Sequence, residues 1–161
     1  MAAEYSANAQ QTVESNQAVV FPAGPTPCNR GLIFHRAESG NFLLANNAPR
    51  GCGCGCTCGC GRQIYETIYG VSFHANIAIP EDGEVEEIQL AIAIDGNEDP
   101  SSIMRVTPAG TEEFWNVGAE ILVAIPSLCG CENVSVRNIS TQPIEVQNAN
   151  LVFTYEGVRR A

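Results

Sequence analysis

The amino-acid sequence predicts an all-β protein, an antiparallel two-sheet sandwich of the jelly-roll type. Short apolar runs alternate with polar residues, the pattern of strands that bury one face. Turn-forming Pro, Gly, Asn and Asp separate these runs at roughly 8–12 residue intervals, as in sandwiches and barrels. No amphipathic helix and no alternation of strand with helix is visible, so the strands are expected to be antiparallel. The 161 residues suit one domain.

The chain is expected to begin with a polar arm, residues 1–17, which precedes the jelly-roll domain, residues 18–161. The first 17 residues are rich in Gln, Asn, Ser and Ala and lack a sustained period. Such a segment predicts either a flexible arm or an extended segment that pairs only within an assembly.

Alternation within the domain predicts about ten strands. Phe73, Ala75, Ile77 and Ile79 share one face of a strand that stops at the turn sequence Pro80–Gly83. The other predicted strands are Ala18–Phe21, Leu32–His35, Phe42–Ala45, Gln63–Tyr69, Ile88–Ile94, Ile103–Val106, Val117–Ile125, Val134–Arg137, Ile144–Gln147 and Leu151–Tyr155.

Two features of this pattern shape the expected architecture. Gly70 is expected to bend or break the long stretch from Gln63 to Ile79. This many strands suits a jelly roll better than a seven-stranded immunoglobulin sandwich, and an eight-stranded closed barrel is the structural alternative.

The charge balance excludes several classes of function. The chain carries 8 basic and 18 acidic residues, a formal net charge of −10, and every basic residue is arginine. Nucleic-acid binding needs a clustered basic face, and docking on an anionic membrane needs basic residues as well. With two histidines and no lysine, few side chains suit acid–base or Schiff-base chemistry, so we expect no enzyme, no nucleic-acid partner and no membrane partner.

A cysteine-rich and glycine-rich loop is expected over residues 50–62. Its five cysteines stand at every second position: Cys52, Cys54, Cys56, Cys58 and Cys60. Thiolates are soft ligands for zinc or copper(I), and glycines let a backbone wrap around an ion. The spacing differs from the C-x₂-C pairs of structural zinc sites. Metal binding, disulfides to other segments and an inert loop therefore remain open, and no cofactor is expected outside this loop.

Isolated residues elsewhere give weaker signals. His35 and His74 lie on predicted strands without a second histidine at ligand spacing, so we expect surface or hydrogen-bonded core residues. Asn133 and Asn138 begin glycosylation sequons, whose use is not expected in a chain without a visible secretory signal. Because no membrane-spanning run is visible either, we expect synthesis in the cytosol and release, if any, by lysis.

Several phrases of the sequence resemble a known group of proteins. They include Val71–Pro80, Leu90–Gly96 and Val134–Pro143, together with Gln17–Phe21 and Val146–Leu151. These phrases resemble small jelly-roll proteins of Firmicutes bacteria and their phages, akin to the tumour-necrosis-factor-like domain that tips collagen-like exosporium filaments. The resemblance covers roughly residues 15–156.

The resemblance implies a homotrimer of jelly rolls displayed on a particle or filament. The chain carries no Gly-X-Y collagen repeat. It therefore looks more like a phage head decoration protein, located on the virion, whose arm, residues 1–17, contacts the major capsid protein or another surface assembly. The first alternative is a spore-surface or extracellular filament component of the same fold, located on a bacterial spore or cell surface. The second is a cysteine-rich metal-binding module. A carbohydrate-binding role is a further possibility, although no aromatic platform is visible.

Overall fold

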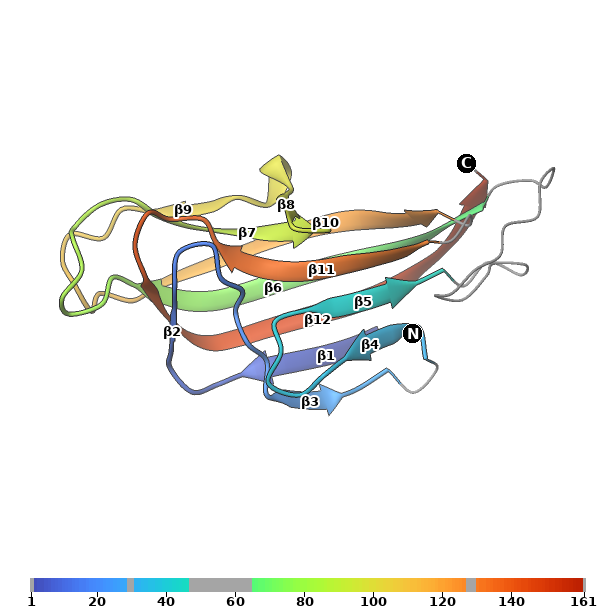
Figure 1. Ribbon diagram of the computed structural model, residues 1–161, viewed down its shortest axis with the longest axis horizontal. Helices are drawn as coiled ribbons and strands as arrows, with labels where there is room; N and C mark the ends of the chain where they lie inside the picture. Colours follow the sequence, from blue (N-terminus) through green and yellow to red (C-terminus); the bar gives the residue numbers. More distant parts are fainter. Residues whose placement is uncertain (1, 29–30, 47–64, 127–129, 161) are drawn as a thin grey trace.

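Two antiparallel sheets pack face to face in the computed structural model, which describes residues 2–28, 31–46, 65–126 and 130–160 (Figure 1). The first sheet has the strand order β10-β6-β12-β1-β3, and β2 also pairs with β12. Its strands are β1 (Ala2–Ala7), β2 (Gln11–Val13), β3 (Ala23–Thr26), β6 (Tyr65–Ala78), β10 (Trp115–Pro126) and β12 (Ile144–Arg160).

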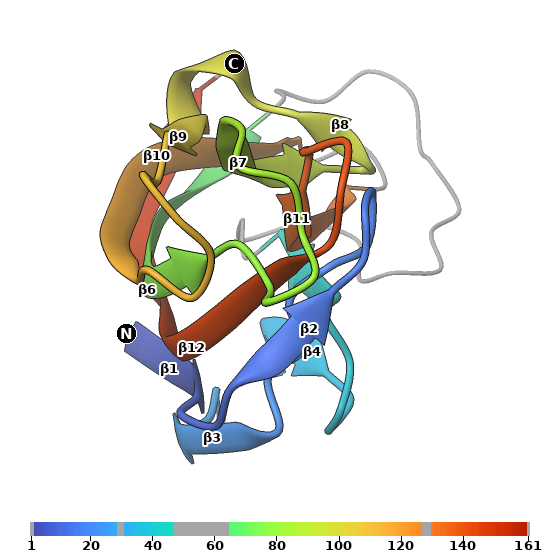
Figure 2. The ribbon, with the colours of Figure 1, turned by 90° about the vertical axis from the view of Figure 1, so that its left-hand side faces the viewer.

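The second sheet has the order β4-β5-β11-β7-β8. Strand β9 pairs with residues 88–90 of β7, and β8 pairs with residues 93–94. Its strands are β4 (Ile33–His35), β5 (Phe42–Ala45), β7 (Ile88–Ile94), β8 (Asn97–Glu98), β9 (Met104–Val106) and β11 (Cys131–Asn138). A 3-10 turn, η1 (Pro100–Ser102), links β8 to β9. Viewed along the strands, the first sheet curves around one side of the molecule opposite β7, β9 and β11 (Figure 2). The predicted two-sheet jelly-roll sandwich is confirmed.

The core lies between the inward faces of the sheets, as the alternation in sequence predicts. Strands β6 and β12 bury Phe73, Ile77 and Phe153, and strands β7 and β11 bury Ile92 and Val136. No helix in the described part of the chain has the length and apolar character needed to span a membrane.

The first residues of the chain correct one expectation. Residues 1–17 are predicted to be a flexible arm or an extended segment that pairs only within an assembly, but β1 pairs with both β12 and β3 of the same chain, and β2 pairs with β12. Tyr5 is 4 % exposed and contacts Phe42 and Phe153 edge-on within the core. The segment is polar because only every second residue of β1 faces the core: Ala3, Tyr5 and Ala7.

Strand boundaries differ from the prediction where a local feature overrides the alternation. Residues 144–160 form one strand, whereas two are predicted. The alternation breaks because a bulge with Asn148 at φ 51° shifts the buried positions from even to odd numbers. Strand β6 also continues through Gly70, which pairs with Leu122 on one side and Thr154 on the other.

The segment that follows β2 joins the two sheets. Residues 18–21 are predicted to be a strand, but the side-chain amide of Gln11 binds both the amide and the carbonyl of Val20 at 2.9 Å. Val19 N donates to Val136 O, and Asn138 N donates to Gln17 O, so this segment lies along β11 of the second sheet. The chain therefore crosses from one sheet to the other within residues 11–19.

Candidate functional site

The predicted metal site cannot be compared with the structure, whereas two other cysteines can be placed. Cys52, Cys54, Cys56, Cys58 and Cys60 lie outside the described residues, so zinc or copper binding by them stays a prediction. Cys28 packs against the core, and Cys131, the first residue of β11, is disulfide-bonded. No group of three potential metal ligands among His, Cys, Asp and Glu forms within the described residues.

The two histidines occupy different environments. The ring of His35 stacks on Phe42 at 4.1 Å, and its two nitrogens face the carbonyl oxygens of Asn41 and Phe21 at 3.2 and 2.9 Å. It therefore holds β4 against neighbouring backbone. His74 is exposed on the first sheet.

The two sequon asparagines also differ from acceptor sites on open loops. Asn138 is fully buried, and its side-chain amide donates to the carbonyls of Val13 and Gln142 at 2.9 Å. Its oxygen accepts from Ser140 N at 2.8 Å. Asn138 thus ties β11 to β2 and to the following turn.

One candidate surface is the outer face of the first sheet. Strand register brings Leu122, Gly70 and Thr154 side by side in one row across β10, β6 and β12. Leu122 is 69 % exposed although it lies in the middle of a strand. The neighbouring rows add apolar side chains, and we call the group the apolar patch: Ile68, Gly70, Leu122, Ala124, Val152 and Thr154.

The side chains beside Leu122 in the apolar patch are small. Ala124 and Thr154 are short, and Gly70 has no side chain, although the Glu156 carboxylate lies over it, with Oε1 3.3 Å from the place of a Cβ. An exposed leucine on such a surface leaves its apolar area in contact with water, which favours covering by another surface. Val152 shares its row with Glu120, Ser72 and Glu4, so this polar row limits the patch on that side.

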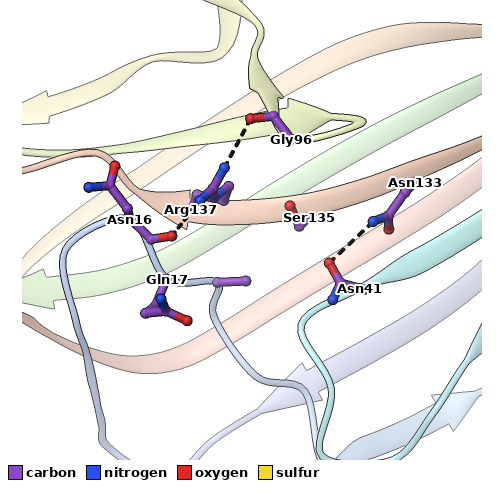
Figure 3. A pocket seen from close by; sticks show the side chains of 8 residues that line it. Asn16, Gln17, Asn41, Gly96, Asn133, Ser135 and Arg137 are labelled. Atoms are coloured by element: carbon purple, nitrogen blue, oxygen red, sulfur yellow. Dashed lines mark hydrogen bonds between the residues drawn. The ribbon is translucent and has the colours of Figure 1, made fainter.

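The second candidate surface is a polar pocket of about 220 Å³ on the second sheet. Figure 3 shows its lining residues, which come from four parts of the fold. Asn133, Ser135 and Arg137 project from β11, Asn41 precedes β5, and Gly96 lies in the turn between β7 and β8. The remaining lining residues are Asn16, Gln17 and Ala18. We call this cavity the polar pocket.

The polar pocket opens where β11 changes its neighbour. Residues 131–134 of β11 pair with β5, whereas Val136 and Asn138 bond to the segment around residues 17–19. The loop before β5 packs closely against residues 18 and 19, since a Cβ on Gly40 would lie 2.6 Å from Ala18 Cβ and 2.7 Å from Val19 O. Gly40 is therefore required for the close approach that forms one wall of the pocket.

Hydrogen bonds hold the rim of the polar pocket. Arg137 donates to Gly96 O at 2.9 Å and also to Asn16 O. The amide of Asn133 donates to Asn41 Oδ1 at 3.4 Å, which is long for a hydrogen bond (Figure 3). Asn133 Oδ1 is buried and has no hydrogen-bond partner within the described part of the structure.

An acidic pair lies next to the polar pocket. Asp95 Oδ1 accepts from Asn133 N at 2.8 Å, and Asp95 N donates to Asn133 O at 2.7 Å. Burial raises the pKa of Glu132 to about 7, and a side-chain hydrogen bond and charge repulsion from Asp95 act in the same direction.

The alternation of β11 predicts which side chains share a face, but nothing local in the sequence places residues 16–18 or Asn41 beside them.

Comparison with known proteins supports the fold without assigning a family. No family model matches the sequence, and no curated protein matches it. Among solved structures, the Eiger TNF of S. frugiperda is similar with a TM-score of 0.62 and 9 % identity, over 96 % of this chain and 91 % of that one.

Two carbohydrate-binding modules match far less well in structure. The family 35 module of Cellvibrio japonicus Abf62 has a TM-score of 0.36 and 8 % identity, over 95 % of this chain and 98 % of that chain. The family 35 module of Clostridium thermocellum has a TM-score of 0.34 and 13 % identity, over 91 % of this chain and 98 % of that chain. The chain is therefore similar in fold to a tumour-necrosis-factor-like jelly roll.

Proposed function

We propose that this protein is a non-enzymatic structural protein whose jelly rolls assemble into a homotrimer through the outer face of the first sheet. The observation that carries the proposal is the exposure of Leu122 within the apolar patch. The trimeric state is what the sequence resemblance to tumour-necrosis-factor-like proteins implies, and the similarity to Eiger TNF supports the fold alone.

The geometry of the first sheet supports assembly at this face. Complete burial of a leucine side chain is worth about 1.5–3 kcal/mol, and a threefold arrangement would repeat that gain in each subunit. Strand β10, which is 12 residues long, is also the edge strand of this sheet, and β6 is its one neighbour in the strand order. A long edge of this kind invites pairing or covering by another chain.

The setting that best fits such an assembly is the surface of a phage head, where the trimer would decorate and stabilise the particle. The resemblance and the absence of a collagen-like repeat support this setting, and a net charge of −10 would keep densely displayed copies soluble. Residues 1–17 would contact the capsid as part of the first sheet. Strand β3 pairs with β1 there, and all four of its residues are exposed. A spore or cell surface is the alternative setting.

The assembly is tested by light scattering coupled to size exclusion, with Leu122→Asp as the disrupting variant. We expect a trimer for the unchanged protein and a monomer for Leu122→Asp, because a carboxylate would be buried in the interface. Val85→Asp is the matched control, since Val85 is 57 % exposed but lies in the loop before β7. A monomeric unchanged protein, or a trimer that tolerates Leu122→Asp, would contradict the proposal.

The setting is tested by the neighbouring genes and by binding to particles. Genes for terminase, portal and major capsid protein beside this one favour the phage head, and purified heads should then retain the trimer on sedimentation. Neighbouring spore-coat genes, or heads that sediment without the protein, would instead favour the spore surface.

A further inference from the structure

We propose that the polar pocket binds a small neutral polyhydroxylated ligand, of the size of one sugar ring. This inference goes beyond the proposed assembly and does not depend on it, because the polar pocket lies on the second sheet and the apolar patch on the first. Its volume of about 220 Å³ is below the range of roughly 300–1,000 Å³ for drug-sized ligands.

The first argument is that hydrogen-bonding groups in the polar pocket are unused. Asn133 Oδ1 is buried without a partner, and the single bond of its amide to Asn41 is long at 3.4 Å. A buried acceptor without a partner is unfavourable, so Asn133 would gain from a donor that enters the pocket. The Ser135 hydroxyl, on the same face of β11, makes no hydrogen bond to the described residues.

The second argument concerns the charge of the ligand. A cation is disfavoured because Arg137 lines the pocket. An anion is disfavoured by Asp95, whose carboxylate accepts from the backbone amide of Asn133, while Arg137 uses two of its five N–H groups on backbone carbonyls. Neutral hydroxyl groups can both donate to Asn133 and accept from Asn41, so they match the amides and the serine.

The third argument is that the walls are already in place. Backbone hydrogen bonds of Asn138 with Asn16 and Gln17 fix one wall at 2.8 and 2.9 Å, and Gly40 allows the close approach beside it. A pocket that needs little rearrangement loses little free energy to ordering when a ligand binds. No aromatic residue lines it, so hydrogen bonds and not ring stacking would hold the sugar.

The test is an NMR titration of the isotope-labelled full chain with glucose, galactose, mannose and N-acetylglucosamine, each into the millimolar range. We expect saturable shifts of amide signals around residues 16–18, 41, 96 and 133–137 with at least one of these sugars. Asn133→Ala should weaken binding about tenfold, the equivalent of one hydrogen-bonding interaction of about 1.4 kcal/mol. Ser135→Ala should also weaken sugar binding, and this variant replaces Asn133→Ala as the test if Asn133→Ala does not fold.

Matched controls lie on the first sheet. Asn116→Ala and Ser72→Ala remove the same groups from β10 and β6 and should leave sugar binding unchanged. The proposal is overturned if no neutral sugar gives saturable shifts at the pocket, or if the controls weaken binding as much as the pocket variants. N-acetylneuraminic acid is titrated in the same way, and the proposal is also overturned if this anionic sugar alone binds, since that result would assign the pocket to acidic ligands.

Discussion

Among the carboxyl groups of the described residues, Glu132 is the one whose pKa the fold clearly shifts. Its pKa rises from the ordinary value of 4.5 to about 7, first because of burial and then because of Asp95. Between these two values the folded chain binds more protons than the unfolded chain. The contribution of Glu132 to stability therefore falls as the pH rises through this window.

Glu132→Gln should raise the thermal stability at about pH 8 and have little effect at about pH 5, because glutamine cannot ionise. The gain at high pH should be below about 1 kcal/mol, since solvent reaches and screens this partly buried pair. Thermal melting across the pH range measures it, with Glu120→Gln on the exposed face of β10 as the control. A difference between variant and unchanged protein that is the same at every pH would contradict this account.

At the scale of the element, the N-terminal strands matter most for the fold. Strand β1 lies between β12 and β3, and its buried residues complete the core of the first sheet. Tyr5 contacts His35, Phe42 and Phe153 from both sheets. A segment that looks like a polar arm in sequence is therefore part of the sandwich.

Tyr5→Ala should lower the free energy of unfolding by about 3–5 kcal/mol, the usual cost of removing a buried aromatic side chain. Urea denaturation measures the change, and Glu14→Ala, at an exposed position between β2 and the crossing segment, should change stability by less than about 0.5 kcal/mol. Equal stability of the two variants would show that residues 1–17 contribute nothing to the folded core.

At the scale of the whole molecule, the sandwich has two outer faces of different character. The first sheet presents the apolar patch around Leu122, and the second presents the polar pocket beside β11. The proposed contact between subunits therefore lies on the first sheet, and the proposed ligand site lies on the second.

If the subunits associate through the first sheet, thermal stability depends on protein concentration, because association stabilises only the folded state. A hundredfold increase in concentration should raise the melting temperature by roughly 5 °C for a trimer of chains this size. Leu122→Asp should abolish this dependence, whereas Val85→Asp should retain it. Calorimetry at several concentrations measures the effect, and a melting temperature that stays constant would contradict the trimer.

The sequence by itself determined the all-β class and most of the strands. Strands β5 and β7 have the predicted boundaries, Phe42–Ala45 and Ile88–Ile94, because side-chain alternation is a local property of a strand with a buried face. The bulge in β12 shifts that alternation by one residue, so a single strand looks like two in the sequence.

Only the tertiary structure decided where the N-terminal residues lie and which surfaces are candidates for function. Strand β3 (Ala23–Thr26) has no alternation to reveal it and exists through its pairing with β1. The polar pocket joins residues as far apart as Asn16 and Arg137, whose proximity depends on sheet order. Strand pairing acts between distant parts of the chain, and a local pattern of residues carries no information about which strands become neighbours.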